Sequence, residues 1–323
     1  MIVLWRVSNH CNLACSFCAY DKRLSIPRVT ADPTQVERFV DLLGEWQAER
    51  GRPVLLSWLG GEPLLWRSLS QLSERAEALG LDLSITTNGT TLGAPRVRAE
   101  LIRRYREVTI SIDGLADFHD AMRGWPGAFT KLSRNVPALI AERNQAGASL
   151  KVRVNVVLMR GNIAQFETLC RNLNDWGVDE ISFNQLGGRD RPEFFPKNRL
   201  SSAEVAMLAA LLPRLRTELG LKGTTLVGGP AYLERIADTV AGRPFPIEDC
   251  RVAETFLFVD EHGRVAPCSF TPEHFDLSID DLRHPADLDA LPARLRALQR
   301  ARPSCDCADC PSTQQFDKFG MAA

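Results

Sequence analysis

Three cysteines near the amino terminus constrain this chain more than any other feature. Cys11, Cys15 and Cys18 follow a short apolar segment, residues 2–7, and are separated by three and two residues. Thiolates are soft ligands that suit iron–sulfur clusters or zinc. A four-iron cluster on three cysteines keeps one iron open, whereas a closed zinc site needs four ligands. His10 is adjacent to Cys11 and badly placed as a fourth ligand, so the spacing favours a cluster over zinc.

The composition is that of an ordinary globular protein. The chain has 323 residues, of which 45% are hydrophobic and 24% charged, enough for one large domain and one small one. A net charge of −1 offers no basic surface for nucleic acid or an anionic membrane. No apolar stretch approaches the roughly 18 residues of a membrane span, and the first residues do not read as a signal peptide. We therefore expect a cytoplasmic protein without nucleic-acid or membrane partners.

Strand and helix patterns alternate along the first two thirds of the chain. Buried-strand patterns occupy residues 2–7, 54–59, 81–87, 108–112, 150–158 and 180–186, with helical patterns between them. This alternation predicts an α/β fold with a parallel sheet and helices outside it. Six units are too few for a full eight-unit barrel, and the pattern allows an open doubly wound sheet or a partial barrel. In both, ligands collect at the carboxyl ends of the strands.

The other cysteines fall into two groups. Cys170 lies on a helical stripe with Phe166, Leu169, Leu173 and Trp176, which predicts a core position because free cysteine behaves as a small buried hydrophobe. Five more are near the carboxyl end: Cys250, Cys268, Cys305, Cys307 and Cys310. In a chain without an export signal, such a group indicates a metal site more than disulfides.

The first cysteine segment resembles the C-x3-C-x2-C signature of the radical S-adenosylmethionine (SAM) enzymes, including the aromatic Phe17 before the third cysteine. The resemblance implies that Cys11, Cys15 and Cys18 hold a 4Fe-4S cluster whose open iron is chelated by the amino and carboxylate groups of SAM. It also implies a core with the (β/α)6 partial TIM barrel, which decides between the two architectures above.

Two further segments match the radical SAM core. Residues 60–63, Gly-Gly-Glu-Pro, are similar to a motif that binds the SAM amino group through its backbone and Glu62; Gly60 and Gly61 would let the backbone approach a ligand. Ser111 and Asp113 resemble residues that contact the SAM ribose, although Asp113 with the glycine after it also fits a simple turn.

Six more polar residues are candidates for binding SAM or substrate. Asn88, in a Thr-Asn-Gly segment found in relatives with auxiliary clusters, also fits a turn. Arg153 and Asn155 share one face of a strand, which indicates a lined cavity or an exposed edge strand. Arg123 follows the Asp113 turn, and the sixth strand ends in two more candidates, Asn184 and Gln185.

The carboxyl-terminal cysteines resemble the auxiliary-cluster domains called SPASM and Twitch. Cys250, Gly263 and Cys268 fit the shared opening on a β-hairpin, which a helix follows. A full SPASM pattern has seven cysteines for two clusters, whereas this chain has five. We therefore expect a radical SAM core over residues 1–228 and a domain with one auxiliary 4Fe-4S cluster over 229–323. Its ligands would be Cys250, Cys268 and two of Cys305, Cys307 and Cys310, with Cys307 and Cys310 preferred; a structural zinc site is the alternative.

The resemblance implies reductive cleavage of SAM to a 5′-deoxyadenosyl radical, which abstracts hydrogen from a substrate in a net oxidation or rearrangement. The electron would come from an external donor such as flavodoxin or ferredoxin. The first strand pattern starts at residue 2, with no module before it to grip a leader peptide, which favours a small molecule or short peptide in natural-product biosynthesis. The alternatives are a leader-dependent maturase of ribosomal peptides and a non-catalytic iron–sulfur redox or sensor protein.

Overall fold

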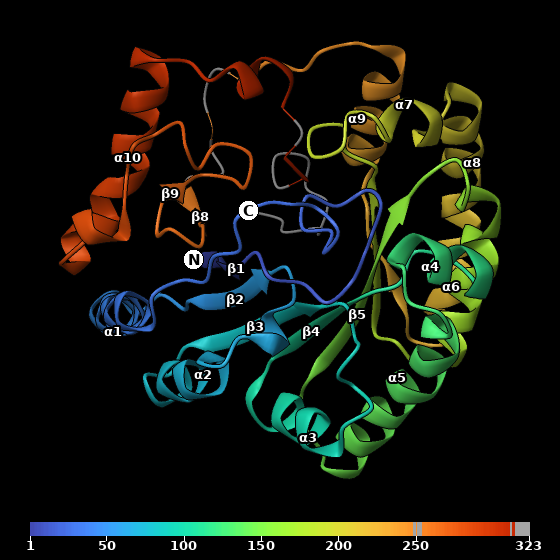
Figure 1. The fold of residues 1–323 in the computed structure, drawn as a ribbon, viewed down its shortest axis with the longest axis horizontal. Coiled ribbons are helices and arrows are strands. Elements are labelled where there is room, and N and C mark those ends of the chain that lie inside the picture. The colour runs from blue at the N-terminus through green and yellow to red at the C-terminus, as the bar shows by residue number, and fades with distance from the viewer. Residues whose placement is uncertain (248–249, 251–253, 311, 314–323) are drawn as a thin grey trace.

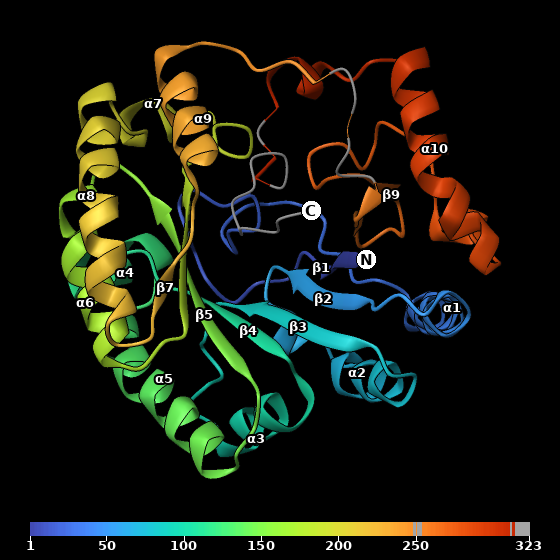
Figure 2. The ribbon, with the colours of Figure 1, turned by 180° about the vertical axis from the view of Figure 1, so that it is seen from behind.

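A curved parallel sheet forms the centre of the protein. The computed structural model describes residues 1–247, 250, 254–310 and 312–313. Its nine strands are ordered β7-β6-β5-β4-β3-β2-β1-β8-β9, and all neighbouring pairs are parallel except β8 with β9. Figures 1 and 2 show the strands curving around an open centre, with the helices on the outside. This confirms the α/β partial barrel predicted from the sequence.

The strands are short and occupy the predicted segments, apart from β7. They are β1 (Ile2–Ser8), β2 (Leu55–Gly60), β3 (Asp82–Thr87), β4 (Glu107–Ser111), β5 (Lys151–Leu158), β6 (Glu180–Gln185), β7 (Thr225–Leu226), β8 (Phe256–Val259) and β9 (Val265–Ala266). The helices are α1 (Pro33–Arg50), α2 (Leu69–Ala78), α3 (Pro95–Arg104), α4 (Ala116–Arg123), α5 (Ala128–Gln145), α6 (Phe166–Asp175), α7 (Phe195–Asn198), α8 (Ser202–Gly220), α9 (Pro230–Ala241) and α10 (Pro285–Ala301).

The ends of α1 show how local sequence sets an element. Asp32 accepts hydrogen bonds from the backbone N–H groups of Thr34 and Gln35 (2.8 and 3.2 Å), and Pro33 occupies the first turn. Gly51 ends the helix in the left-handed conformation at φ 61°, which glycine adopts at little cost. The sequence patterns did not predict the short elements α4, α7 and β7, which span too few residues to show a period.

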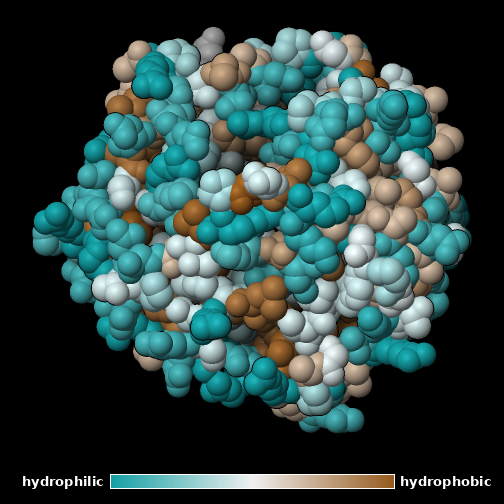
Figure 3. Space-filling view, in the orientation of Figure 1, coloured by the Kyte–Doolittle hydropathy of each residue, from teal (hydrophilic) through white to brown (hydrophobic). Residues whose placement is uncertain are grey.

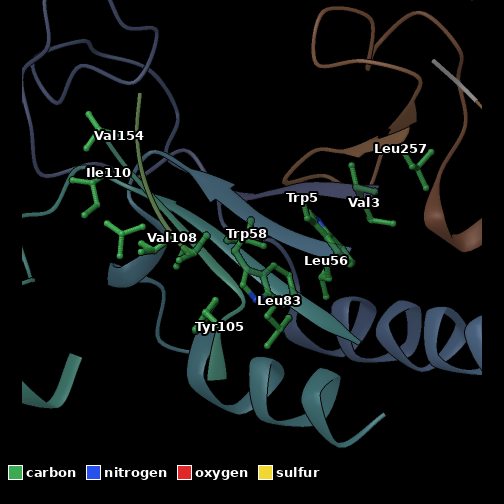
Figure 4. Close-up of a cluster of buried hydrophobic side chains, with 14 of the residues drawn as sticks. Val3, Trp5, Leu56, Trp58, Leu83, Tyr105, Val108, Ile110, Val154 and Leu257 are labelled. Atoms are coloured by element: carbon green, nitrogen blue, oxygen red, sulfur yellow. The ribbon is translucent and has the colours of Figure 1, made fainter. Parts of the chain in front are cut away.

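The hydrophobic core lies between the sheet and the outer helices. Figure 4 shows Trp5, Trp58 and Leu83 pointing from neighbouring strands toward the helix layer, and both tryptophans are fully buried. The indole N–H of Trp58 donates to Ser73 Oγ on α2 at 3.0 Å. Cys170 is also fully buried in this core, as predicted.

The opposite face of the strands, toward the inside of the barrel, carries several polar side chains. Ser57 and Ser84 are register partners on β2 and β3, and Ser111, Asn155 and Ser182 are register partners on β4, β5 and β6. Ser84 Oγ donates to Ser57 Oγ at 2.7 Å, and Ser182 Oγ donates to Asn155 Oδ1 at 2.9 Å. Parallel sheets are usually apolar on both faces, so these side chains indicate an inner face built for a polar ligand.

Arg153 lies on the same face of the sheet but at the amino end of the barrel. Its guanidinium pairs with Glu107 and Glu180, the first residues of β4 and β6. The structure therefore places Arg153 in an ion-pair network near the amino ends of the strands, not beside the loop of the first three cysteines. Both carboxylates that pair with the guanidinium come from the chain itself, and the assignment of Arg153 to cofactor binding stays a prediction.

The carboxyl-terminal hairpin continues the barrel sheet. β8 pairs in parallel with β1, from Ile2 opposite Phe256 to Trp5 opposite Val259, and β9 completes the hairpin. In Figures 1 and 2, α10 lies on the side of the barrel opposite α5. The predicted hairpin and helix are present, and the hairpin shares a sheet with the core. A boundary at residue 228 stays a prediction.

The surface and the helices add two observations. On the face drawn in Figure 3 the rim is mostly hydrophilic, and hydrophobic residues gather nearer the middle. None of the helices in the described part of the chain combines the length and apolar character that a membrane span requires.

Candidate functional site

The loop that contains Cys11, Cys15 and Cys18, here called the cysteine loop, follows β1 at the carboxyl end of the barrel. Each thiol accepts a hydrogen bond: Cys11 Sγ from Leu13 N (3.4 Å), Cys18 Sγ from Tyr20 N (3.4 Å) and Cys15 Sγ from Arg123 Nη1 (3.9 Å). Burial raises the pKa of all three free thiols, and a bound metal would favour their deprotonation. Donors aimed at the sulfurs stabilise thiolates and tune a cluster they ligate. The donor set fits an iron–sulfur cluster.

Two glycines let the end of β2 pack against the start of this loop. A Cβ atom on Gly61 would lie 2.1 Å from His10 O, and one on Gly60 would lie 2.5 Å from Ser8 O. The backbone N–H groups of Gly61 and Glu62 donate to Ser8 O and His10 O at 2.7 and 2.8 Å. The glycines are thus required by the cysteine loop itself, in addition to any approach to a ligand.

The carboxylate of Glu62 is fully enclosed. Its two oxygens accept hydrogen bonds from Thr87 Oγ1 (2.7 Å), Asn88 N (2.7 Å) and Leu64 N (3.2 Å). Burial raises the pKa of Glu62 to about 7, against the opposing effect of these donors. Through these hydrogen bonds, Glu62 links the end of β2 to the end of β3 beside the cysteine loop. Whether it also contacts SAM stays a prediction.

Asn88 reaches the cysteine loop directly. Its side-chain amide donates to Asn12 Oδ1 at 2.9 Å and to Cys11 Sγ at 3.8 Å. Asn12 donates in turn to Thr90 Oγ1 at 3.0 Å. Asn88 was predicted from the sequence as a site residue, but Asn12 was not. The position of Asn12 between the first two cysteines could have indicated that it belongs to the site.

Arg123 joins three predicted site residues. Its Nε donates to Asp113 Oδ2 at 2.7 Å, its guanidinium lies 5.3 Å from the centre of the Phe17 ring, and it reaches Cys15. Burial alone would lower the pKa of Arg123, but the Asp113 carboxylate and nearby thiols hold it above its ordinary value. The buried cation thus balances negative charge on both Asp113 and the cysteine loop.

Asp113 is held within this network. It lies beyond the end of β4, is fully buried, and accepts from Val157 N at 2.9 Å as well as from Arg123. Its backbone N–H donates to Nδ1 of His119 at 3.1 Å, and burial lowers the pKa of His119 to about 4. His119 therefore stays neutral. The sequence offered no signal for His119, because α4 was not predicted.

The other candidates lie on or beside the polar inner face. Ser111 is half-buried at the end of β4 and is the register partner of Asn155. Asn184 Nδ2 donates to Asn155 Oδ1 at 3.1 Å, and Gln185 donates to Thr239 Oγ1 at 3.1 Å. The structure brings Ser111, Asn155 and Asn184 together, while Gln185 points to α9.

A second group of thiols meets in the carboxyl-terminal region. Cys250, Cys268, Cys307 and Cys310 line one small apolar cavity, and the charges of the other three would raise the pKa of Cys307 further after burial. Cys305, in the same short 3₁₀ helix as Cys307, is exposed and does not line the cavity. Four of the five predicted thiols are therefore brought together, including the preferred pair.

The thiols do not converge on a single point. Across the described ranges, no three His, Cys, Asp or Glu side chains are arranged to hold one metal ion. In a four-iron cluster, each thiolate binds its own iron. The ligand sulfurs of such a cluster therefore lie farther apart than those around a single metal ion.

Arg6 connects the two cysteine regions and was not predicted. Its guanidinium pairs with Glu261 in the turn between β8 and β9 and lies 5.7 and 5.4 Å from the ring centres of Tyr20 and Phe258. Tyr20 is two residues after Cys18. The contact depends on the pairing of β8 with β1, which sequence periodicity does not reveal.

Comparison with protein families decides the class. The model of the Radical SAM superfamily matches residues 5–173, a segment that includes the first three cysteines and the Gly60–Glu62 turn. The chain belongs to the radical SAM superfamily. Enzymes of this superfamily use a 4Fe-4S cluster and SAM, and membership places the chain among enzymes.

Curated relatives are similar to this radical SAM chain over much of its length. Pre-heme d1 synthase of Dinoroseobacter shibae is 31% identical over 227 residues, 65% of this chain and 51% of the relative. PqqA peptide cyclase of Streptomyces rochei is 28% identical over 266 residues, 82% of this chain and 68% of the relative. The chain spans about half the length of the first of these relatives.

Solved structures share the fold. Streptococcus suis SuiB bound to S-adenosylmethionine superposes with a TM-score of 0.68 at 19% identity, over 93% of this chain and 67% of that one. The shared region extends beyond the barrel into the carboxyl-terminal part. At this level of identity, the likeness concerns the fold alone.

The enclosed carboxylate gives a testable prediction. We expect Glu62→Gln to lower the free energy of unfolding by about 1–3 kcal/mol, because its amide nitrogen must face a donor that the carboxylate accepted. Chemical denaturation measures this, with Glu74→Gln on the exposed face of α2 as a control that changes it by less than about 0.5 kcal/mol. A Glu62→Gln protein as stable as the wild type would contradict the role given to this carboxylate.

Proposed function

We propose that this protein cleaves SAM reductively and uses the resulting radical to abstract hydrogen from a substrate inside the barrel. The main support for the proposal is the placement of three hydrogen-bonded thiols on one loop at the strand ends, beside polar side chains of the inner face. When bound, the cluster and SAM supply the one-electron cleavage and a reactive carbon radical. The chain's own residues hold these groups and orient the substrate.

At the first site, Cys11, Cys15 and Cys18 are the proposed cluster ligands. Asn88 and Arg123 donate to their sulfurs. SAM would lie between the open iron and the inner face, where Gly60–Glu62, Phe17, Ser111 and Asp113 are the residues proposed to position it. In the structure, Glu62 and Asp113 support this site mainly by fixing the backbone around it.

At the second site, we assign the auxiliary cluster to Cys250, Cys268, Cys307 and Cys310. Its support is the shared cavity and the exposure of Cys305. Four thiolates complete the ligands of a four-iron cluster. With its ligands filled by protein, such a cluster suits electron transfer from the substrate and therefore a net oxidation.

The substrate we favour is a small molecule or a short peptide with several hydrogen-bonding groups. Asn155, Ser182 and Asn184 offer amide and hydroxyl groups on the inner face, and a site that pairs such groups strongly rejects analogues lacking them. Natural-product biosynthesis supplies substrates of this kind. The electron for SAM cleavage comes from an external one-electron carrier.

A second candidate, maturation of a ribosomal peptide, has one specific observation in its favour. The relative named PqqA peptide cyclase is 28% identical to this chain over 82% of its length. Tight binding of a precursor peptide, with dependence of turnover on its leader segment, would favour this candidate over a small molecule.

The cluster-ligand assignment is tested by Cys15→Ala. We expect this variant to lose SAM cleavage, measured as 5′-deoxyadenosine after reduction with dithionite, while keeping the iron of the auxiliary cluster. Cys170→Ala removes a buried core thiol instead and should keep both iron and cleavage. Survival of cleavage in Cys15→Ala would refute the first site.

The auxiliary ligand set is tested by two neighbouring serine variants. Cys307→Ser should lose about four irons per chain, because it removes a thiol from the shared cavity. Cys305→Ser should retain them, because its side chain is exposed and outside that cavity. Loss of iron in Cys305→Ser, or its retention in Cys307→Ser, would show that the assignment is wrong.

A further inference from the structure

A basic pocket lies on the outer side of the cysteine loop, away from the polar inner face. Its volume is about 570 Å³, and the loop forms part of its wall through Asn12 and Leu13. The facing wall belongs to α5, which contributes Lys131 and Arg134. Figure 1 shows the blue cysteine loop beside α4 and the green helices that follow it, and Ala14 N donates to Arg123 O there at 3.2 Å.

The pocket is positively charged and lacks counter-charge. Lys22, Lys131 and Arg134 are exposed on its wall, and no acidic residue lines it. Within the part of the chain that the structure describes, none of these three cations forms an ion pair, whereas many surface arginines do. Lys131 Nζ is instead held 5.3 Å from the ring centre of Trp125. In a chain of net charge −1, this is a local concentration of uncompensated positive charge.

The wall of the pocket is one hydrogen bond from a proposed cluster ligand. Leu13 N donates to Cys11 Sγ at 3.4 Å, and Asn12 is linked to the same sulfur through Asn88. Lys22 N donates to Leu13 O at 3.0 Å. A molecule bound against this wall would therefore lie close to the first cluster without entering the barrel.

We propose that this pocket is the docking surface for an acidic one-electron carrier protein of the flavodoxin or ferredoxin kind. The proposal rests on the proposed function, which requires one electron from outside the chain. The reduced carrier loses one electron and the oxidised cluster gains it, with no bond formed or broken and no proton transferred. Transient redox partners bind through small interfaces, and opposite charge accelerates their encounter.

Binding is the first test. Reconstituted protein is titrated with purified oxidised flavodoxin at low and high salt, comparing the wild type with K22E/K131E/R134E. The control R103E/R294E/R300E makes the same change in net charge at exposed cations of α3 and α10. We expect the pocket variant to weaken binding about tenfold or more at low salt, and the control to weaken it much less. Equal weakening in both variants, or none in the pocket variant, would overturn the proposal.

Reduction is the second test and separates this proposal from the proposed function. The pocket variant should form 5′-deoxyadenosine at the wild-type rate with dithionite, a small reductant, and lose the flavodoxin-driven rate. An unchanged flavodoxin-driven rate would overturn the docking surface. Failure of the wild type with dithionite would overturn the proposed function, while the binding test still decides on docking.

A variant with fewer substitutions avoids changing a residue of the cysteine loop. If K22E/K131E/R134E loses the dithionite rate as well, K131E/R134E on α5 replaces it, because neither residue is part of the loop. The double variant should keep the dithionite rate and weaken flavodoxin binding several-fold. Wild-type flavodoxin binding in the double variant would overturn the proposal.

Discussion

The contact between the backbone before Cys11 and the Gly60–Glu62 turn underlies the rest of the site. Only glycine fits at Gly61, where a Cβ would lie 2.1 Å from His10 O, and the N–H groups of Gly61 and Glu62 bind the loop from below. Glu62 then fixes Asn88, and Asn88 reaches Cys11. The positions of the thiols thus follow from two neighbouring strands of the sheet, which is how a rigid scaffold holds a loop of ligands.

The cysteine loop separates two surfaces with different chemistry. The inner face carries neutral hydrogen-bonding groups on β4, β5 and β6, while the outer pocket is lined by Lys22, Lys131 and Arg134. Arg123, between them, neutralises Asp113 and supports Cys15 without exposing its charge. On this account, substrate and electron donor approach the first cluster from opposite sides, so neither blocks the other.

Much of this arrangement could be predicted from the sequence, because its signals are local. The cysteine spacing, the alternation of strands and helices and the preferred pair Cys307 and Cys310 each lie within a short segment. The role of Arg153 could not be predicted, because the ion pairs that fix it come from residues 46 and 27 positions away in the chain. Arg6 was missed for the same reason: its partner Glu261 is brought to it by the pairing of β8 with β1.

The central claim is that one chain holds a SAM-cleaving cluster and one auxiliary cluster. The most direct measurement is anaerobic reconstitution with iron and sulfide, followed by iron analysis and by assay of 5′-deoxyadenosine after dithionite and SAM are added. We expect about eight irons per chain, from two four-iron clusters, together with 5′-deoxyadenosine. About four irons with 5′-deoxyadenosine would contradict the auxiliary cluster, and iron without SAM cleavage would contradict the proposed activity.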